Sequence, residues 1–141
     1  MTLTIGVTGP DKETQTAAAE TLIAALTKRG YAVGAIKSHA HGDFDLDRPG
    51  KASYRHRAAG ARETVLTSPT MLACIRYRDA DPKLPEAVVC FGPEIEMIVT
   101  DGFAQAADIM VTAPIADLDA VVNTAVGRLA LSGDTSRESG A

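Results

Sequence analysis

The residues with the clearest chemical pattern lie at positions 9–16, in the run Gly-Pro-Asp-Lys-Glu-Thr-Gln-Thr. An apolar run precedes them and an alanine- and leucine-rich stretch follows, which is the strand–loop–helix setting of a phosphate-binding P-loop, G-x-x-x-x-G-K-[ST]. Gly9 and Thr16 fit this pattern, but Thr14 stands in the place of the second glycine and Gln15 in that of the lysine. The segment therefore predicts a phosphate-binding turn that lacks its usual cation.

These two substitutions lower the expected affinity for a triphosphate. An amide at position 15 donates a neutral hydrogen bond, which contributes about 1 kcal/mol, where a hydrogen bond to a charged group contributes about 1.5–3 kcal/mol. If position 14 needs a positive φ, a threonine there costs roughly another 1–2 kcal/mol. Lys12 offers a replacement cation inside the loop, and Thr16 offers a ligand for Mg²⁺. Two interpretations stay open, a residual phosphate site and a turn that only resembles one.

A second pattern lies between His39 and Asp47, where every odd position is histidine or aspartate. An extended backbone would place all of these side chains on one face, and imidazole and carboxylate groups together are credible ligands of a divalent ion. The alternative, which we favour, is a solvated loop of which one or two side chains line a cleft. The loop follows a predicted strand, at the sheet edge where α/β proteins bind ligands.

A third candidate is Asp101, which follows the apolar run 95–100 and precedes Gly102. An acidic residue at the end of a strand beside a P-loop can hold Mg²⁺ or its water, as a Walker-B group does. The Asp-Gly pair is also typical of a plain turn.

The elements that must position these residues follow from hydrophobic periodicity and from glycine and proline punctuation. Predicted strands alternate with predicted helices, which indicates an α/β fold with an open, mostly parallel sheet and flanking helices. We expect one domain over residues 1–131 and a disordered tail over 132–141, which is rich in serine, glycine and charge. The expected strands cover residues 3–8, 31–37, 62–67, 72–77, 96–100 and 109–112, and the expected helices cover 17–28, 52–59, 85–90 and 115–129.

Composition narrows the class of protein. The net charge is −4 and no Lys/Arg-rich stripe is present, which argues against nucleic-acid binding. No apolar stretch approaches the length of about 18 residues that spans a bilayer, so we expect no membrane partner. Cys74 and Cys90 lack CxxC spacing and predict free, buried thiols in a reducing cytoplasm.

The block from Ile36 to Ala61 resembles the MobB family, the molybdopterin-guanine dinucleotide biosynthesis proteins B. Members carry a Walker A loop, an I-K-H-x-[AH]-H segment, a D-x-P-G-K-D-S segment, an A-G-A ending and a later V-E-G-F strand end. The resemblance extends over about residues 3–103. The matching positions are Gly9, Thr16, Lys37, His41, Asp47, Pro49, Gly50, Lys51, Ser53, Ala59, Gly60, Ala61, Gly102 and Phe103.

The resemblance implies a P-loop NTPase-like fold and a homodimer that binds GTP with Mg²⁺ and hydrolyses it weakly. It also implies a partner, the MobA-like guanylyltransferase that joins GMP to molybdopterin. The departures from the family pattern fall where nucleotide chemistry resides. They are Thr14 and Gln15 in the Walker A loop, Ser38 for a histidine, Ala52 for an aspartate, Asp101 for a glutamate and Ala104 for a lysine.

Three hypotheses of function follow. The first, which we favour, is a cytoplasmic accessory protein of molybdenum cofactor biosynthesis with weak or lost GTP binding, at most a weak GTPase. The second is a working GTPase in which Lys12, Lys37 or Lys51 replaces the missing lysine. The third is a metal- or pterin-binding module without nucleotide chemistry, built on His39, His41 and the aspartates of the same loop. The candidate ligand-binding residues, for a nucleotide or a molybdopterin-type ligand, are Gly9, Lys12, Thr14, Gln15, Thr16, Lys37, His41, Asp47 and Lys51, and those for Mg²⁺ are Thr16 and Asp101.

Overall fold

The computed structural model describes residues 2–39 and 48–138. By its internal contacts the chain divides into two compact units, where the sequence predicted one domain over 1–131. The first unit comprises Met1–Ser38 and Lys83–Ala141, and the second comprises His39–Pro82. His41 and Asp47 lie outside the described residues.

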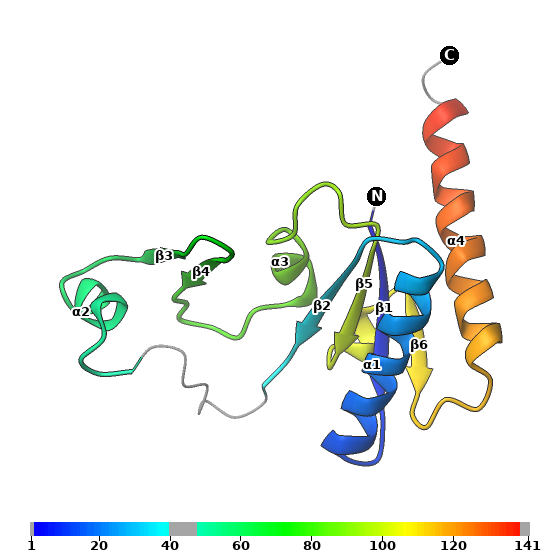
Figure 1. Cartoon of the computed structure of the whole chain (residues 1–141), viewed down its shortest axis with the longest axis horizontal. Helices are drawn as coiled ribbons and strands as arrows, with labels where there is room; N and C mark the ends of the chain where they lie inside the picture. Colours follow the sequence, from blue (N-terminus) through cyan, green and yellow to red (C-terminus); the bar gives the residue numbers. More distant parts are fainter. Residues whose placement is uncertain (1, 40–47, 139–141) are drawn as a thin grey trace. The chain divides into compact units, whose positions relative to one another are not determined.

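The first unit is built on a parallel sheet of four strands (Figure 1). Their order is β2 (Val33–Lys37), β5 (Met97–Asp101), β1 (Leu3–Thr8) and β6 (Ile109–Thr112). Every pair of neighbours is parallel. The two central strands are buried along nearly their whole length because both of their faces are covered. The prediction of an open, mostly parallel α/β sheet is confirmed.

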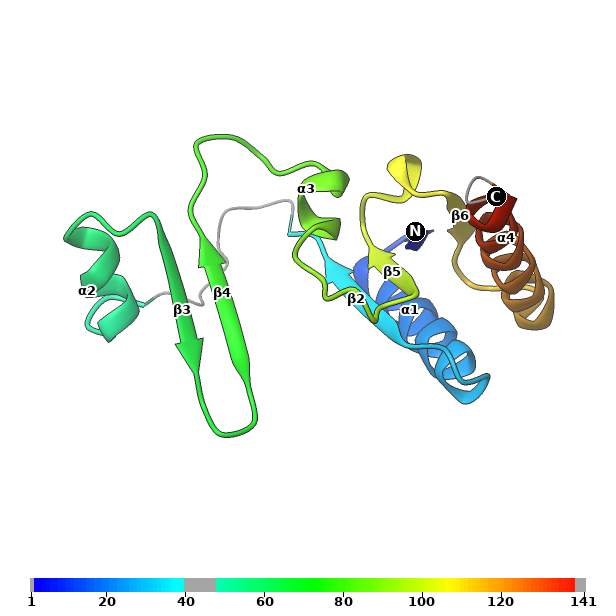
Figure 2. The ribbon, with the colours of Figure 1, turned by 90° about the horizontal axis from the view of Figure 1, so that it is seen from above.

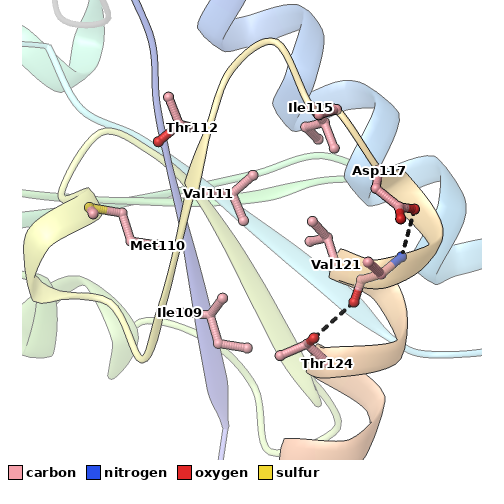
Figure 3. Close-up of a pocket in the computed structure, with 10 residues that line it drawn as sticks. Ile109, Met110, Val111, Thr112, Ile115, Asp117, Val121 and Thr124 are labelled. Carbon is pink, nitrogen blue, oxygen red and sulfur yellow. Dashed lines mark hydrogen bonds between the residues drawn. The ribbon is translucent and has the colours of Figure 1, made fainter.

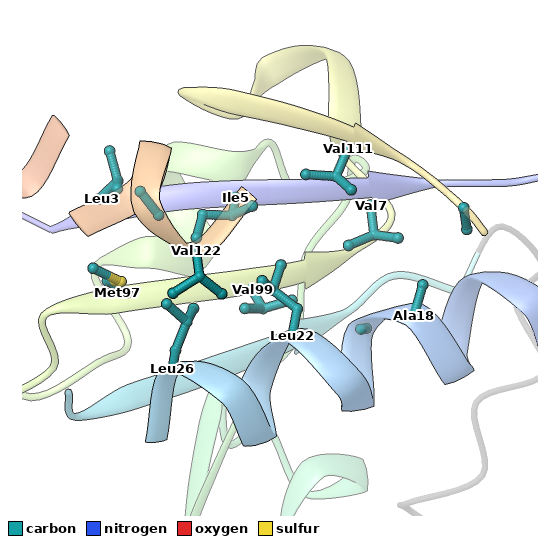
Figure 4. Packing of buried hydrophobic residues seen from close by; sticks show 13 residues of the cluster. Leu3, Ile5, Val7, Ala18, Leu22, Leu26, Met97, Val99, Val111 and Val122 are labelled. Carbon is teal, nitrogen blue, oxygen red and sulfur yellow. The ribbon is translucent and has the colours of Figure 1, made fainter. Parts of the chain in front are cut away.

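Helices α1 (Lys12–Lys28) and α4 (Leu118–Glu138) cover one face of this sheet. Their apolar side chains interlock with those of the strands in a single hydrophobic core (Figure 4). The core is formed by Leu3, Ile5, Val7, Ala18, Ala19, Leu22, Leu26, Met97, Val99, Val111, Ala113, Val122 and Ala125.

The opposite face is covered more thinly, by short elements. The one-turn helix η1 (Ala104–Ala106) passes so close to β1 that a Cβ on Gly6 would lie 2.5 Å from the Ala104 Cα. Helix α3 (Leu84–Val88) leads into Phe91, whose ring lies against Gly34 of β2. Small residues in the strands are therefore required where these segments cross the sheet.

Both long helices differ from their predicted bounds. Helix α1 begins at Lys12 rather than at 17, because Asp11 supplies a side-chain cap that starts the helix early. It ends as expected before Gly30, which adopts a φ of +95°. Helix α4 continues to Glu138, so the segment predicted to be a disordered tail begins inside this helix.

The second unit contains helix α2 (Ala52–Ala58) and a separate antiparallel hairpin of β3 (Glu63–Thr67) and β4 (Leu72–Arg76), shown in Figure 2. Both strands were expected, but their pairing into a sheet of their own was not. The guanidinium of Arg57 lies 4.0 Å from the centre of the Tyr77 ring and ties the helix to the end of the hairpin.

Two further expectations can be compared with the structure. Cys74 and Cys90 are free, as predicted, but both are exposed, so the prediction of buried thiols is wrong. Among the helices that the structure describes, none has the length and apolar character needed to cross a bilayer.

Leu22 tests the core of the first unit, because its side chain is 0% exposed between α1 and the sheet. Leu22→Ala should lower the free energy of unfolding by about 2–5 kcal/mol, since the helix cannot collapse fully into the cavity. Urea unfolding measures this loss, with Glu20→Ala on the exposed side of the same helix as the control. A loss below about 1 kcal/mol would mean that Leu22 is not packed as described.

Candidate functional site

The candidate site lies at the carboxyl edge of the parallel sheet, where three strand ends come together. In the strand register, Asp101 of β5 stands between Val7 of β1 and Lys37 of β2. The turn that leads from β1 into α1 begins just beyond Thr8. Parallel topology therefore brings together residues that are far apart in the sequence.

The turn between β1 and α1 consists only of Gly9, Pro10 and Asp11. Asp11 has an extended backbone, and its carboxylate accepts hydrogen bonds from the backbone N–H and the hydroxyl of Thr14 at 2.8 and 3.0 Å. The N–H of Gln15 donates to the Asp11 carbonyl at 3.1 Å. This arrangement is an ordinary capped helix start.

The capped helix changes the interpretation of position 14. Thr14 lies within α1, and among the described residues other than glycine only Phe103 has a positive φ. The condition for strain at Thr14, a positive φ, is therefore not met, and Thr14 adds no backbone penalty. Gly9 is favoured for a reason other than a tight turn, since a Cβ there would lie 3.1 Å from the Cβ of Ala113, a tight contact.

The cap also decides what the helix start can bind. A P-loop surrounds phosphate with unpaired backbone N–H groups at the positive end of a helix. Here the carboxylate of Asp11 takes that place, and the hydrogen bonds from Thr14 lower the pKa of Asp11, so it is negative at neutral pH. A phosphate would have to displace an anion that the chain itself supplies.

Asp101 organises the second half of the site. The Gln15 side-chain amide donates to Asp101 Oδ1 at 2.7 Å, and the Thr16 hydroxyl donates to Oδ2 at 2.8 Å. The Lys37 ammonium lies 3.0 Å from the same Oδ2. Asp101 is buried, whereas the Lys37 side chain is 39% exposed. Three segments of the chain thus meet on one carboxylate.

The charge state of Asp101 follows from opposing effects. Burial is the largest single influence and raises the pKa of Asp101. The hydrogen bonds from Gln15, Lys37 and Thr16, together with the Lys37 charge, lower the pKa and outweigh the effect of burial. The net result is a pKa below the ordinary value of 3.8. At neutral pH the cluster is therefore a carboxylate balanced by an ammonium.

The structure brings together only some of the predicted site residues. Gln15, Thr16, Lys37 and Asp101 form one cluster. Lys12 is exposed at the start of α1. Lys51 is exposed directly before α2 in the second unit and is not placed relative to the cluster.

A cavity of about 440 Å³ adjoins the cluster, and no sequence pattern predicted it. Phe103 contributes to its wall in a left-handed conformation, with φ 54° and ψ 21°. The Gly-Phe pair, noted only as a family match, was the available signal. The cavity is lined by Val7, Thr8, Gln15, Gly102, Phe103, Ala104, Gln105 and Ala106.

A separate groove of about 410 Å³ runs between β6 and the start of α4 (Figure 3). Ile109, Val111, Ile115 and Val121 give it an apolar lining. At its rim Asp117 accepts a hydrogen bond from the Ala120 N–H at 3.1 Å and caps α4. Its polar groups serve the helix, so the groove adds no chemistry to the site.

The residues at the strand ends do not fit a Mg²⁺-bound triphosphate as they are arranged. The anion position at α1 holds Asp11. The two oxygen donors offered for Mg²⁺, on Thr16 and Asp101, are bonded to each other, and Asp101 is also paired with Lys37. Within residues 2–39 and 48–138, no three His, Cys, Asp or Glu side chains gather in a way that could hold a metal ion.

The parallel sheet, the glycine-led turn after β1 and the acidic end of β5 define an α/β protein of the P-loop NTPase-like class. The sequence profile of the MobB family, Molybdopterin guanine dinucleotide synthesis protein B, matches residues 4–117. The chain belongs to the MobB family.

Individual relatives agree with this assignment. Over 47 residues the chain is 53% identical to the Molybdopterin-guanine dinucleotide biosynthesis adapter protein of Escherichia coli (strain K12), a match that covers 33% of this chain and 26% of the relative. The matched segment is thus about a quarter of that protein's length.

Solved structures of MobB proteins share the fold. The crystal structure of molybdopterin-guanine biosynthesis protein B (mobB) has a TM-score of 0.58 at 23% identity, over 78% of this chain and 67% of the other. The MobB homologue from Bacillus stearothermophilus has a TM-score of 0.56 at 19% identity, over 78% and 62%. Bacillus subtilis MobB has a TM-score of 0.56 at 20% identity, over 86% and 72%.

Asp11→Ala tests the capped turn. Loss of the carboxylate leaves the N–H and the hydroxyl of Thr14 without their partner, so the melting temperature should fall by a few degrees. It should also leave the helix start open to anions, so added inorganic phosphate should stabilise the variant more than the natural chain. Thermal unfolding with and without phosphate measures both effects, and Glu20→Ala is the control. If phosphate stabilises the two proteins equally, the Asp11 carboxylate does not keep anions away from the start of α1.

The pH dependence of stability tests Asp101. Because the folded pKa is below the ordinary 3.8, the ionised carboxylate stabilises the fold above about pH 3.8 and this contribution is lost as the pH falls through the folded value. Asp101→Asn should cost about 1–3 kcal/mol at pH 7. Below pH 4 the free energies of unfolding of the two proteins should converge, as measured by urea titrations across pH. A constant difference down to pH 2 would show that the Asp101 charge is not the stabilising element.

Proposed function

We propose that this protein is an adapter of molybdopterin-guanine dinucleotide biosynthesis that binds GTP weakly or not at all and acts through partners. Membership of the MobB family supports the pathway, and the name of the Escherichia coli relative supports the adapter role. On this proposal the protein hydrolyses GTP weakly at most.

The observation that carries the loss of nucleotide binding is the arrangement of Asp11 and Gln15. Both are engaged within the protein, Asp11 with Thr14 and Gln15 with Asp101. A bound triphosphate would be repelled by the Asp11 carboxylate and would have to displace it from the helix start. Position 15 holds glutamine and not lysine, so it would supply no positive charge to offset this repulsion. The unfavourable terms at this site therefore add to one another.

The partner we propose is the guanylyltransferase that joins GMP to molybdopterin, and we propose a homodimer as the working form. The exposed apolar side chains of the β3–β4 hairpin support an association surface, since Val65, Met71 and Leu72 are 58%, 70% and 65% exposed. The free state of both cysteines is consistent with the cytoplasmic location that we propose.

The alternative is a GTP-binding protein in which another lysine supplies the missing charge. Lys37 is the cation of the strand-end cluster, which favours it over the exposed Lys12. Its ammonium is already paired with Asp101, so its use for phosphate would leave the carboxylate without its counter-charge. We therefore keep this as the second candidate.

Calorimetric titration of the full chain with GTP and Mg²⁺ tests the proposal. We expect no binding in the micromolar range and no release of phosphate. A variant that combines Asp11→Gly, Thr14→Gly and Gln15→Lys restores the P-loop pattern, and it should bind GTP at least about tenfold more tightly than the natural chain, a gain of about 1.4 kcal/mol.

Micromolar GTP affinity of the natural chain, with phosphate release, would overturn the proposal. The adapter role has its own measurement, sedimentation of the chain mixed with a MobA-like guanylyltransferase. A shared boundary supports it, and independent boundaries at micromolar concentrations contradict it.

A further inference from the structure

Asp101 and Thr16 present two oxygen donors of the kind that a divalent cation binds, but a cation of the chain itself lies beside them. One carboxylate oxygen, Oδ2, faces the Thr16 hydroxyl at 2.8 Å and the Lys37 ammonium at 3.0 Å. A carboxylate and a hydroxyl side by side are the oxygen donors that Mg²⁺ and Mn²⁺ accept. The positive charge that these donors attract is already present.

The backbone holds this ammonium in place. Lys37 and Asp101 are direct partners in the β2–β5 register. The next residue, Ser38, donates its N–H to the Asp101 carbonyl at 3.0 Å, which pins the end of β2 to the end of β5. Gly102, with a φ of +112°, permits this approach, because a Cβ there would lie 2.6 Å from the Ser38 Cβ.

We propose that Lys37 is a built-in cation that occupies the position of a divalent ion at Asp101 and Thr16 and thereby closes this site to metal. A tethered ammonium competes with a free ion at a high effective concentration, and it cannot diffuse away. The donor pair is a latent Mn²⁺ or Mg²⁺ site that the natural chain keeps filled. This inference extends the proposed function, because a site with its own cation has no use for Mg²⁺-bound nucleotide, but it is tested without nucleotide.

The simpler account is a surface ion pair with no bearing on metal. A partly exposed pair of this kind contributes about 0–1 kcal/mol to stability, so stability measurements alone cannot separate the two accounts. Metal binding can, since only the proposal requires that loss of Lys37 creates an affinity that the natural chain lacks.

The experiment uses Mn²⁺ alone as the probe, on the full chain at neutral pH and low salt, with free Mn²⁺ followed by electron paramagnetic resonance. Lys37→Met should bind Mn²⁺ at least about tenfold more tightly than the natural chain, which is about 1.4 kcal/mol. Adding Asp101→Asn to this variant should abolish the gain. Lys28→Met at the far end of α1 makes the same change in net charge and should gain nothing.

Two results would overturn the proposal. The folded Lys37→Met could bind Mn²⁺ no more tightly than the natural chain, or Lys28→Met could gain as much affinity as Lys37→Met. Circular dichroism checks the fold, and Lys37→Gln serves in place of Lys37→Met if the latter does not fold. None of these readouts involves GTP, so failure here and failure of the proposed loss of nucleotide binding are separate results.

Discussion

The buried carboxylate of Asp101 is the interaction on which the architecture of the site depends. A charge taken out of water is costly unless it is paired and hydrogen-bonded. The chain meets this requirement with donors from two other segments, the first turn of α1 and the end of β2. The Lys37 ammonium balances the charge of Asp101, and the side chains of Gln15 and Thr16 donate hydrogen bonds to it.

The same condition holds at the start of α1. A helix start presents unpaired N–H groups and a positive potential, and it attracts an anion. In this chain the anion is Asp11, three residues before its partner Thr14. The two charged positions of a nucleotide site, one for phosphate and one for its metal, are therefore both supplied from within the protein. The chain has a MobB fold in which the polar groups at the start of α1 and at the strand ends are engaged in contacts within the protein.

The fold could be predicted because its signals are local. The buried strands are short apolar runs bounded by polar residues, and Leu3–Thr8 and Ile109–Thr112 have their expected limits. Helix α1, which is rich in alanine and leucine, ends before Gly30 as expected. The start of α1 was missed because the P-loop pattern was given precedence over Asp11, although Asp is itself one of the preferred N-cap residues. The pairing of β3 with β4 in a separate hairpin was missed because an apolar run does not specify its neighbour.

By itself, the sequence determined the class of the fold, the family and the identity of the residues that depart from the family's nucleotide loop. These properties depend on residue type and on spacing over a few positions. Only the tertiary structure decided what those residues do instead. Gln15 contacts Asp101 across a separation of 86 positions, and Lys37 reaches the same carboxylate from a neighbouring strand. Such contacts depend on the order of strands in the sheet, which is set by packing of the whole core and not by any local segment.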